Sequence, residues 1–500
     1  DGLKYGAFRI KSGENWLILM GSDFDFIPME PWASRHTDIP RAQKEWDEKV
    51  KGKTDSSWLL PWRGVYKSKW GPKDFEQILD SYYGEGSSST WKSGGNSLSG
   101  FWCHDEGGTL NAVCHFLNTL GMRWYMPESG GEVIPAMSSI PLLITEEEVR
   151  PDYAIRHQMY YNYSGFSFDE VLWNMRLGMN FGHEKFGIAF AHGLHLVHGH
   201  ELMQKKHPEY YALINGKRDT EHRTYGTPCL MSEGLFKETI SFARFLFDEY
   251  DLPVVDIWPG DGLKTCQCDL CKGKDAPELV WNFADRVSKE IYKTHPDRII
   301  NCGAYANYRQ SPDTIKKFSP NLSVSIANRG CPMFDDPEKW ADYVKDIESW
   351  REKIAAGRIL RTENIRYHIY GETETEPVPF PIIFPHTMAK DLKYLNGIAM
   401  GLRGEMSQVG GEWKAIGLGH ITIYVQSRFL WDADQDVEPL LDEYYKLFYG
   451  PAAAKMKEAF TFAEQNYNRK DTSRSGGRND PRNVSLKVSL RFRDLLDEAR

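Results

Sequence analysis

The side chains best suited to chemistry are three carboxylates, each close behind an apolar or aromatic run. They are Asp261, Glu363 and Glu405. Glycines on both sides of Asp261 let the backbone turn sharply and leave its carboxylate exposed. Hydrolysis of a glycosidic bond needs one carboxylic acid to protonate the leaving oxygen. A second group must stabilise or attack the positively charged sugar carbon. Carboxylates that lie close together at one opening of the fold fit that chemistry.

The three carboxylates are predicted to have different roles. Asp261 is the predicted general acid. Glu405 is its predicted partner, because it follows Gly404 at the end of an apolar run. Glu363 lies two residues from Arg361, and a nearby arginine keeps a carboxylate ionised. We therefore expect Glu363 to bind substrate, with an exchange of roles between the two glutamates left open.

Polar and aromatic residues near the same opening are candidates for substrate contacts, since aromatic rings pack well against the apolar faces of sugars. The basic residues among them, together with Arg361 and Arg403, could pair with an anionic substrate or with the carboxylates. The candidates are Arg156, His157, His200, Trp258, Tyr305, Asn307, Asn328 and Arg329.

Two further clusters are possible metal ligands. Cys266, Cys268 and Cys271 form one compact thiol group, whereas a structural zinc site needs four ligands and usually pairs two such groups. A disulfide or reduced thiols are therefore favoured, and no metal or cofactor is predicted. The histidines at 192, 195, 198 and 200 lack the spacing of a zinc protease motif, so we expect one or two of them to bind substrate hydroxyls.

The elements that must position these residues alternate between short apolar runs and amphipathic helical stretches. This alternation favours a parallel sheet, and its length favours a closed (β/α)₈ barrel with catalytic groups at the carboxyl ends of the strands. An open doubly wound sheet is the alternative, but no glycine-rich phosphate loop follows the first run. The predicted strands are 155–161, 187–191, 254–259, 299–305, 322–327, 359–363 and 398–405, and the predicted helices are 168–177, 235–250, 278–294, 336–355 and 386–396.

Three regions are predicted along the 500 residues. Residues 1–150 form a small α/β domain, with a strand at 17–20, a Gly/Ser-rich loop at 84–100 and a helix near 110–117. Residues 151–432 form the catalytic barrel, and residues 433–500 are helical. The sequence starts at Asp1 without an apolar leader, so we expect any targeting signal to lie outside it, and we expect the chain to continue past the helical pattern at Arg500.

Composition excludes several classes of protein. A net charge of −9, with no long basic run, argues against binding to nucleic acid. No apolar stretch is long enough to span a membrane, and eight cysteines are too few for a disulfide scaffold. Neither a nucleophile elbow nor a Walker loop occurs, so esterases and NTPases are not supported. Aromatic residues reach 13%, which suits either carbohydrate binding or a large core.

Several motifs resemble a bacterial family described as a domain of unknown function, which includes the endo-β-N-acetylglucosaminidases of glycoside hydrolase family 163 that act on complex N-glycans. The resemblance is carried by His198–His200, His207–Arg218 and Pro228–Leu230, by Pro259–Gly262 with the cysteine group, and by Phe429–Asp432 with Tyr444–Ala453. The segment from Gly107 to Pro127 is similar to the α/β domain that precedes the barrel in α-glucuronidases and β-hexosaminidases.

The resemblance implies a barrel glycosidase that needs no cofactor, acts on an oligosaccharide or polysaccharide, and is periplasmic, cell-surface or secreted. Asp261 is the catalytic residue that matches by motif. Substrate-assisted hexosaminidases place two acidic residues on one strand, whereas Gly262 follows Asp261 here. The second carboxylate must then come from another strand. Two alternatives stay open: an exo-glycosidase for uronic or sulfated polysaccharide, and a catalytically silent carbohydrate-binding protein.

Overall fold

The computed structural model describes most of the chain outside the region 24–106. The described residues are 2–23, 107–127, 129–141, 144–162, 168–180, 192–199, 201–222, 226–250, 254–328, 335–364, 383–408, 416–466 and 484–500. The predicted Gly/Ser-rich loop at 84–100 and the predicted strand at 187–191 lie outside these residues.

A six-stranded parallel sheet lies at the centre of the molecule. Its order is β6-β13-β12-β11-β10-β9, so the first strand of the region pairs with the last. The alternation predicted from the sequence is thereby confirmed for six of its seven strands. The strands are β6 (Ile155–Asn162), β9 (Val254–Asp256), β10 (Ile299–Ala304), β11 (Leu322–Asn328), β12 (Ile359–Asn364) and β13 (Ala399–Gln408).

The sheet is curled. Arg403 on β13 and Asp256 on β9 are separated by four strand spacings, which would place them about 19 Å apart in a flat sheet. The charge of Arg403 nevertheless lowers the pKa of the Asp256 carboxyl, against the larger raising effect of burial. This effect is consistent with a sheet that curls into a half-barrel with both residues on its inner side.

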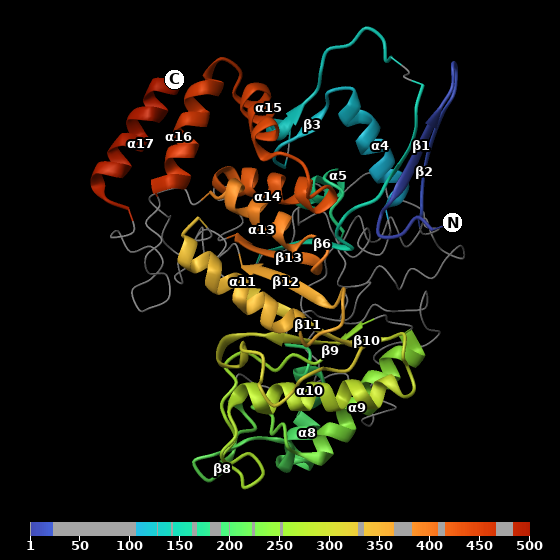
Figure 1. Cartoon of the computed structure of the whole chain (residues 1–500), viewed down its shortest axis with the longest axis vertical. Helices are drawn as coiled ribbons and strands as arrows, with labels where there is room; N and C mark the ends of the chain where they lie inside the picture. Colours follow the sequence, from blue (N-terminus) through green and yellow to red (C-terminus); the bar gives the residue numbers. More distant parts are fainter. Residues whose placement is uncertain are drawn as a thin grey trace.

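Helices cover the outer side of the sheet. Figure 1 shows the strands in succession from β6 and β13 to β10 and β9, with α13 and α14 beyond one end of the series and α9 and α10 beyond the other. Asp275 and Asp336 cap α10 and α11 by accepting hydrogen bonds from backbone N–H groups of the first turn. The helices are α5 (Phe168–Arg176), α9 (Glu233–Tyr250), α10 (Ala276–Tyr292), α11 (Pro337–Arg351), α13 (Pro385–Leu395) and α14 (Ile416–Trp431).

Large aromatic side chains fill the layer between the sheet and these helices. The rings of Trp281 on α10 and Trp350 on α11 lie 4.4 Å apart, and Phe318 packs against both. Both tryptophans are fully buried. Full burial of one such side chain contributes roughly 1.5–3 kcal/mol, so this cluster fixes how α10 and α11 pack on the sheet.

The described part of the amino-terminal region contains an antiparallel sheet and a helix. Strands β1 (Phe8–Ser12), β2 (Leu17–Gly21) and β5 (Glu146–Val149) form an antiparallel sheet in the order β2-β1-β5. Helix α4 (Gly108–Thr119) packs on it so closely that a Cβ atom on Gly21 would lie 2.1 Å from the backbone of Gly108. A short hairpin follows, made of β3 (Arg123–Trp124) and β4 (Glu132–Val133).

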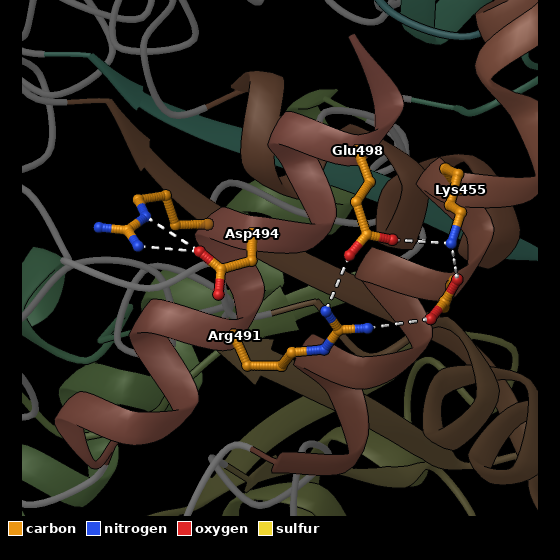
Figure 2. A network of polar contacts seen from close by, with 6 residues as sticks. Lys455, Arg491, Asp494 and Glu498 are labelled. Carbon is orange, nitrogen blue, oxygen red and sulfur yellow. Dashed lines mark hydrogen bonds and ion pairs between the residues drawn. The ribbon is translucent and has the colours of Figure 1, made fainter.

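The described carboxyl-terminal residues contain three helices, α15 (Val437–Tyr449), α16 (Ala453–Asn466) and α17 (Leu486–Ala499). Figure 2 shows an ion-pair network between α16 and α17. Lys455 contacts Glu498 at 2.8 Å, and Arg491 contacts Glu498 at 2.9 Å and Glu458 at 3.5 Å. Exposed pairs of this kind contribute little stability, so the network mainly aligns the two helices. None of the helices in the described ranges is long and apolar enough to cross a membrane.

A histidine joins helix α13 to both α15 and α16. The Nδ1 atom of His386 lies 2.5 Å from Glu464, and its Nε2 atom lies 2.9 Å from Glu438. The hydrogen bond to Glu464 is the main cause that raises the pKa of His386 to about 9. An unfolded histidine titrates near 6.5. The stability supplied by this contact is therefore complete below about pH 6.5 and is lost as the pH rises through about 9.

We expect the melting temperature of the wild-type protein to fall more between pH 6.5 and 9.5 than that of His386→Gln, because glutamine does not titrate. Thermal unfolding followed by circular dichroism at both pH values measures this difference. Equal pH dependence in the two proteins would contradict the assignment of a charged His386.

Candidate active site

Three rings line the edge of the sheet where β9 and β10 end. Trp258 follows β9, Tyr305 follows β10, and His192 comes from an earlier segment. The ring centroids of His192 and Trp258 are 5.4 Å apart, those of Trp258 and Tyr305 are 5.5 Å apart, and those of His192 and Tyr305 are 5.9 Å apart. Trp258 is buried and donates from Nε1 to the Tyr308 hydroxyl at 2.7 Å. The rings therefore form a wall with Trp258 at its base and the half-buried Tyr305 nearer the surface.

Asp261 lies beside this wall. Its carboxylate is half-buried and accepts a hydrogen bond of 3.2 Å from the Tyr305 hydroxyl. Gly262, which follows, has a φ of 75°, a left-handed conformation that glycine adopts without strain. Asn307, also beyond β10, is exposed, and its Nδ2 atom lies 3.5 Å from the Leu263 carbonyl. The acid predicted from the sequence thus sits in contact with a predicted substrate-binding aromatic residue.

A second acid, Asp256, was missed by the sequence analysis although it ends β9. Its carboxylate accepts hydrogen bonds from the Gly193 N–H at 2.8 Å and from Asn301 Nδ2 at 2.6 Å. Burial raises its pKa to about 7, while these hydrogen bonds and Arg403 act in the opposite direction. Asp256 is only 4% exposed, so it positions the segment that carries His192 against β9. The sequence feature that could have identified Asp256 is its place as the one acidic residue in the apolar run 254–258.

We expect Asp256→Ala to destabilise the fold, because the Asn301 amide and the Gly193 N–H would each lose a buried acceptor, at about 1–3 kcal/mol. A carboxyl whose pKa rises from 3.8 to about 7 on folding contributes stability that is lost as the pH increases through 7. The stability difference from wild type should therefore be larger at pH 5 than at pH 8. Urea unfolding at both pH values tests this, and an equal difference would contradict a titrating Asp256.

Two predicted substrate-binding residues lie on β6, beside β13. Arg156 and His157 are the second and third residues of β6 and pair with Leu402 and Arg403, so they point to opposite faces of the sheet. The Arg156 guanidinium is fully buried, donates to the backbone carbonyls of Gly178 and Tyr5, and lies over the Trp431 ring. The expectation that Arg156 contacts substrate does not fit this placement. It joins Tyr5 of the amino-terminal region to β6 and to Trp431 of α14 instead.

The backbone register places the remaining carboxylates. In the pairing of β12 with β13, Asn364 is opposite Glu405, and Glu363 is opposite both Gly404 and, on β11, Asn328. All of these positions are at the carboxyl-terminal edge, as is Asp261. Because strand positions alternate between faces, position 405 shares the inner face with Arg403.

Position 363 shares its face with Arg361, which is buried against helix residues. Its Nε atom lies 3.3 Å from the Tyr343 hydroxyl and 3.4 Å from an Asp391 carboxylate oxygen. This alternation favours position 405 over position 363 as the partner of Asp261. The other two predicted contacts, His200 and Arg329, lie outside the described residues.

The thiol group has a fourth member that the sequence analysis did not include. The Cys229 sulfur lies 3.7 Å from that of Cys266 and 3.8 Å from those of Cys268 and Cys271. All four cysteines are free, so the disulfide considered from the sequence is not formed. Their arrangement is that of possible metal ligands.

Among solved structures, the chain is similar to the family 89 glycoside hydrolase of Clostridium perfringens in complex with its substrate GlcNAc-alpha-1,4-galactose. The TM-score is 0.42 and the identity 11%, over 72% of this chain and 46% of that one. The complex of the family 89 enzyme with PUGNAc gives a TM-score of 0.40 at 10% identity, over 74% and 47%. A family 138 enzyme targeting pectin rhamnogalacturonan II gives 0.29 at 9%, over 73% and 47%. This chain thus spans about half the length of those structures.

No curated protein matches the chain in sequence. A family model matches residues 126–461, about two thirds of the chain, and is described as a domain of unknown function, DUF4838. The chain therefore belongs to the DUF4838 family.

Proposed function

We propose that this chain is a glycoside hydrolase whose six described parallel strands belong to a closed (β/α)₈ barrel. The observation that carries the proposal is the half-buried carboxyl of Asp261, hydrogen-bonded to Tyr305 beside the aromatic wall. In such barrels, catalytic groups gather at the carboxyl ends of the strands, where Asp261 lies. An acid next to rings that can hold a sugar is what cleavage of a glycosidic bond requires.

In this proposal Asp261 protonates the leaving oxygen while the sugar lies against the exposed part of the wall. The Tyr305 hydroxyl holds the acid in place and favours one orientation of its proton. Position 405, on the inner face of β13, supplies the second carboxylate from across the half-barrel. A separation of roughly 5 Å between the two carboxyls would make the enzyme retaining, and one of 6.5–9.5 Å would make it inverting.

The proposed substrate is a glycan cut at an internal β-linked N-acetylglucosamine. The support for this substrate is the motif resemblance over residues 198–230 and 259–271. Gly262 follows Asp261, so the group that polarises the acetamide would also come from another strand, with position 405 best placed. A uronic or sulfated polysaccharide is less well supported, because the guanidinium groups of Arg156 and Arg361 are buried among protein atoms.

Digestion of a glycan panel, analysed by mass spectrometry, tests the proposal. The panel includes complex N-glycans and algal polysaccharides, and Asp261→Asn serves as the inactive control. We expect cleavage next to N-acetylglucosamine by the wild-type protein alone. Release of uronic or sulfated fragments would show that the substrate is a uronic or sulfated polysaccharide and not the proposed glycan. Glycan binding without turnover of any panel member would instead identify a carbohydrate-binding protein and contradict the proposal.

A further inference from the structure

Four cysteine sulfurs from two distant segments meet at one point, and three of them belong to the loop that carries Asp261. Cys229 comes from the segment before α9, and Cys266, Cys268 and Cys271 come from the loop between β9 and α10. All four sulfur atoms lie within 4.8 Å of one another, and three of the four residues are buried. Each is a free cysteine.

The three sulfur–sulfur distances from Cys229 are those expected between the ligands of one tetrahedral metal ion. Zinc binds four cysteine sulfurs at about 2.3 Å, so neighbouring sulfurs in such a site are about 3.8 Å apart. The Cys229 sulfur lies 3.7 Å from that of Cys266 and 3.8 Å from each of the other two. A disulfide would require about 2.05 Å and would join only two of them. The common distance from Cys229 to three partners fits a shared central ion.

The backbone around the sulfurs has the form of a metal-binding turn. Cys268 and Cys271 have the two-residue spacing of a zinc knuckle, and the N–H groups of Cys271 and Lys272 donate to the Cys268 carbonyl at 3.0 and 2.9 Å. Gly273 then turns the chain with a φ of 81°. The Leu213 N–H points at the Cys266 sulfur at 3.2 Å, a contact that favours a negatively charged sulfur.

We propose that Cys229, Cys266, Cys268 and Cys271 bind one zinc ion in a structural site. Four thiolates complete a tetrahedral shell and leave no position open for a reacting water. Soft sulfur ligands in this geometry suit zinc better than magnesium, calcium or manganese. The site is independent of the proposed glycosidase activity, since it involves none of the residues assigned to catalysis.

The zinc ion would join three parts of the fold near the end of the molecule where α8 (Glu201–Lys206), α9 and α10 lie (Figure 1). One is the segment before α9, and another is the loop that begins at Asp261. The third is the hairpin of β7 (Leu213–Ile214) and β8 (Lys217–Arg218), which is bound to that loop by a hydrogen bond of 2.8 Å from the Gln267 N–H to the Leu213 carbonyl. The ion would thus hold in place the loop that carries Asp261.

Metal analysis of the purified 500-residue chain tests the site without any substrate. We expect about one zinc per chain by inductively coupled plasma mass spectrometry. Replacement of that zinc by Co²⁺ should give the visible absorption and sulfur-to-cobalt charge-transfer bands of a tetrahedral tetrathiolate. Absence of zinc after purification, with no Co²⁺ spectrum on addition of cobalt, would overturn the proposal. One equivalent of iron in place of zinc would overturn the assignment of the metal.

A pair of cysteine variants sharpens the test. Cys268→Ser removes the least buried of the four sulfurs and should lose the zinc during dialysis against a chelator, whereas the wild type should keep it. Cys114→Ser is the matched control, since Cys114 is a free, buried cysteine in the amino-terminal unit. The control should keep its zinc. Equal zinc retention in Cys268→Ser and wild type would contradict the site. If Cys268→Ser misfolds, the zinc content of the wild type still tests the proposal.

Discussion

Asp261→Asn is expected to abolish turnover of the glycan substrate while the fold stays intact. Asparagine has nearly the same shape and can still accept from the Tyr305 hydroxyl, but it has no proton to give to the leaving oxygen. Loss of a general acid alone lowers the rate by roughly 10²–10⁴-fold. The measurement is the initial rate on the glycan that the panel identifies, together with the melting temperature, which should stay close to that of the wild type.

Asp297→Asn is the matched control for this variant. Asp297 is an exposed carboxylate that precedes β10, so it lies at the opposite edge of the sheet, and its nearest ion-pair partner is its neighbour Arg298 at 3.4 Å. The control should keep full activity. If Asp261→Asn also kept most of its activity, the acid would have to be Glu405 or Glu363, and the motif match at residues 259–262 would be wrong.

The existence of six strands could be predicted because they are short, largely apolar runs. The predicted run 322–327, for example, corresponds to β11, Leu322–Asn328. Helix α14 was not predicted, since Ile421, Thr422 and Ile423 are β-branched and favour strands in isolation. All three are almost fully buried, so the helix has no exposed polar face and no amphipathic period by which to recognise it.

Contacts between distant segments could not be predicted. Cys229 precedes Cys266 by 37 residues, and only the fold brings its sulfur to the other three. The role of Asp256 depends on Asn301, which is 45 residues away on the next strand of the sheet. Arg156 was misplaced for a related reason. An apolar run shows that a strand exists, but contacts with distant segments decide which of its side chains are covered, and Tyr5 and Trp431 cover Arg156.

The second carboxylate can be identified by chemical rescue. Glu405→Ala is expected to lose turnover, and azide should restore it on an activated glycoside, because a small anion can occupy the space of a deleted nucleophile and attack the sugar carbon. The reason for choosing Glu405 is its register position. It pairs with Asn364 and shares the inner face with Arg403, whose positive charge acts on groups inside the half-barrel.

Glu363→Ala is the matched comparison. Position 363 is on the same edge of the sheet as position 405 but on the opposite face. We expect this variant to weaken substrate binding, with a higher KM and no rescue by azide. Rescue of Glu363→Ala but not of Glu405→Ala would exchange the two roles. Rescue of neither would contradict a nucleophilic carboxylate and leave inversion or assistance by the substrate acetamide as the mechanism. In that case the anomeric configuration of the first product, measured by NMR, decides between them, because only inversion changes it.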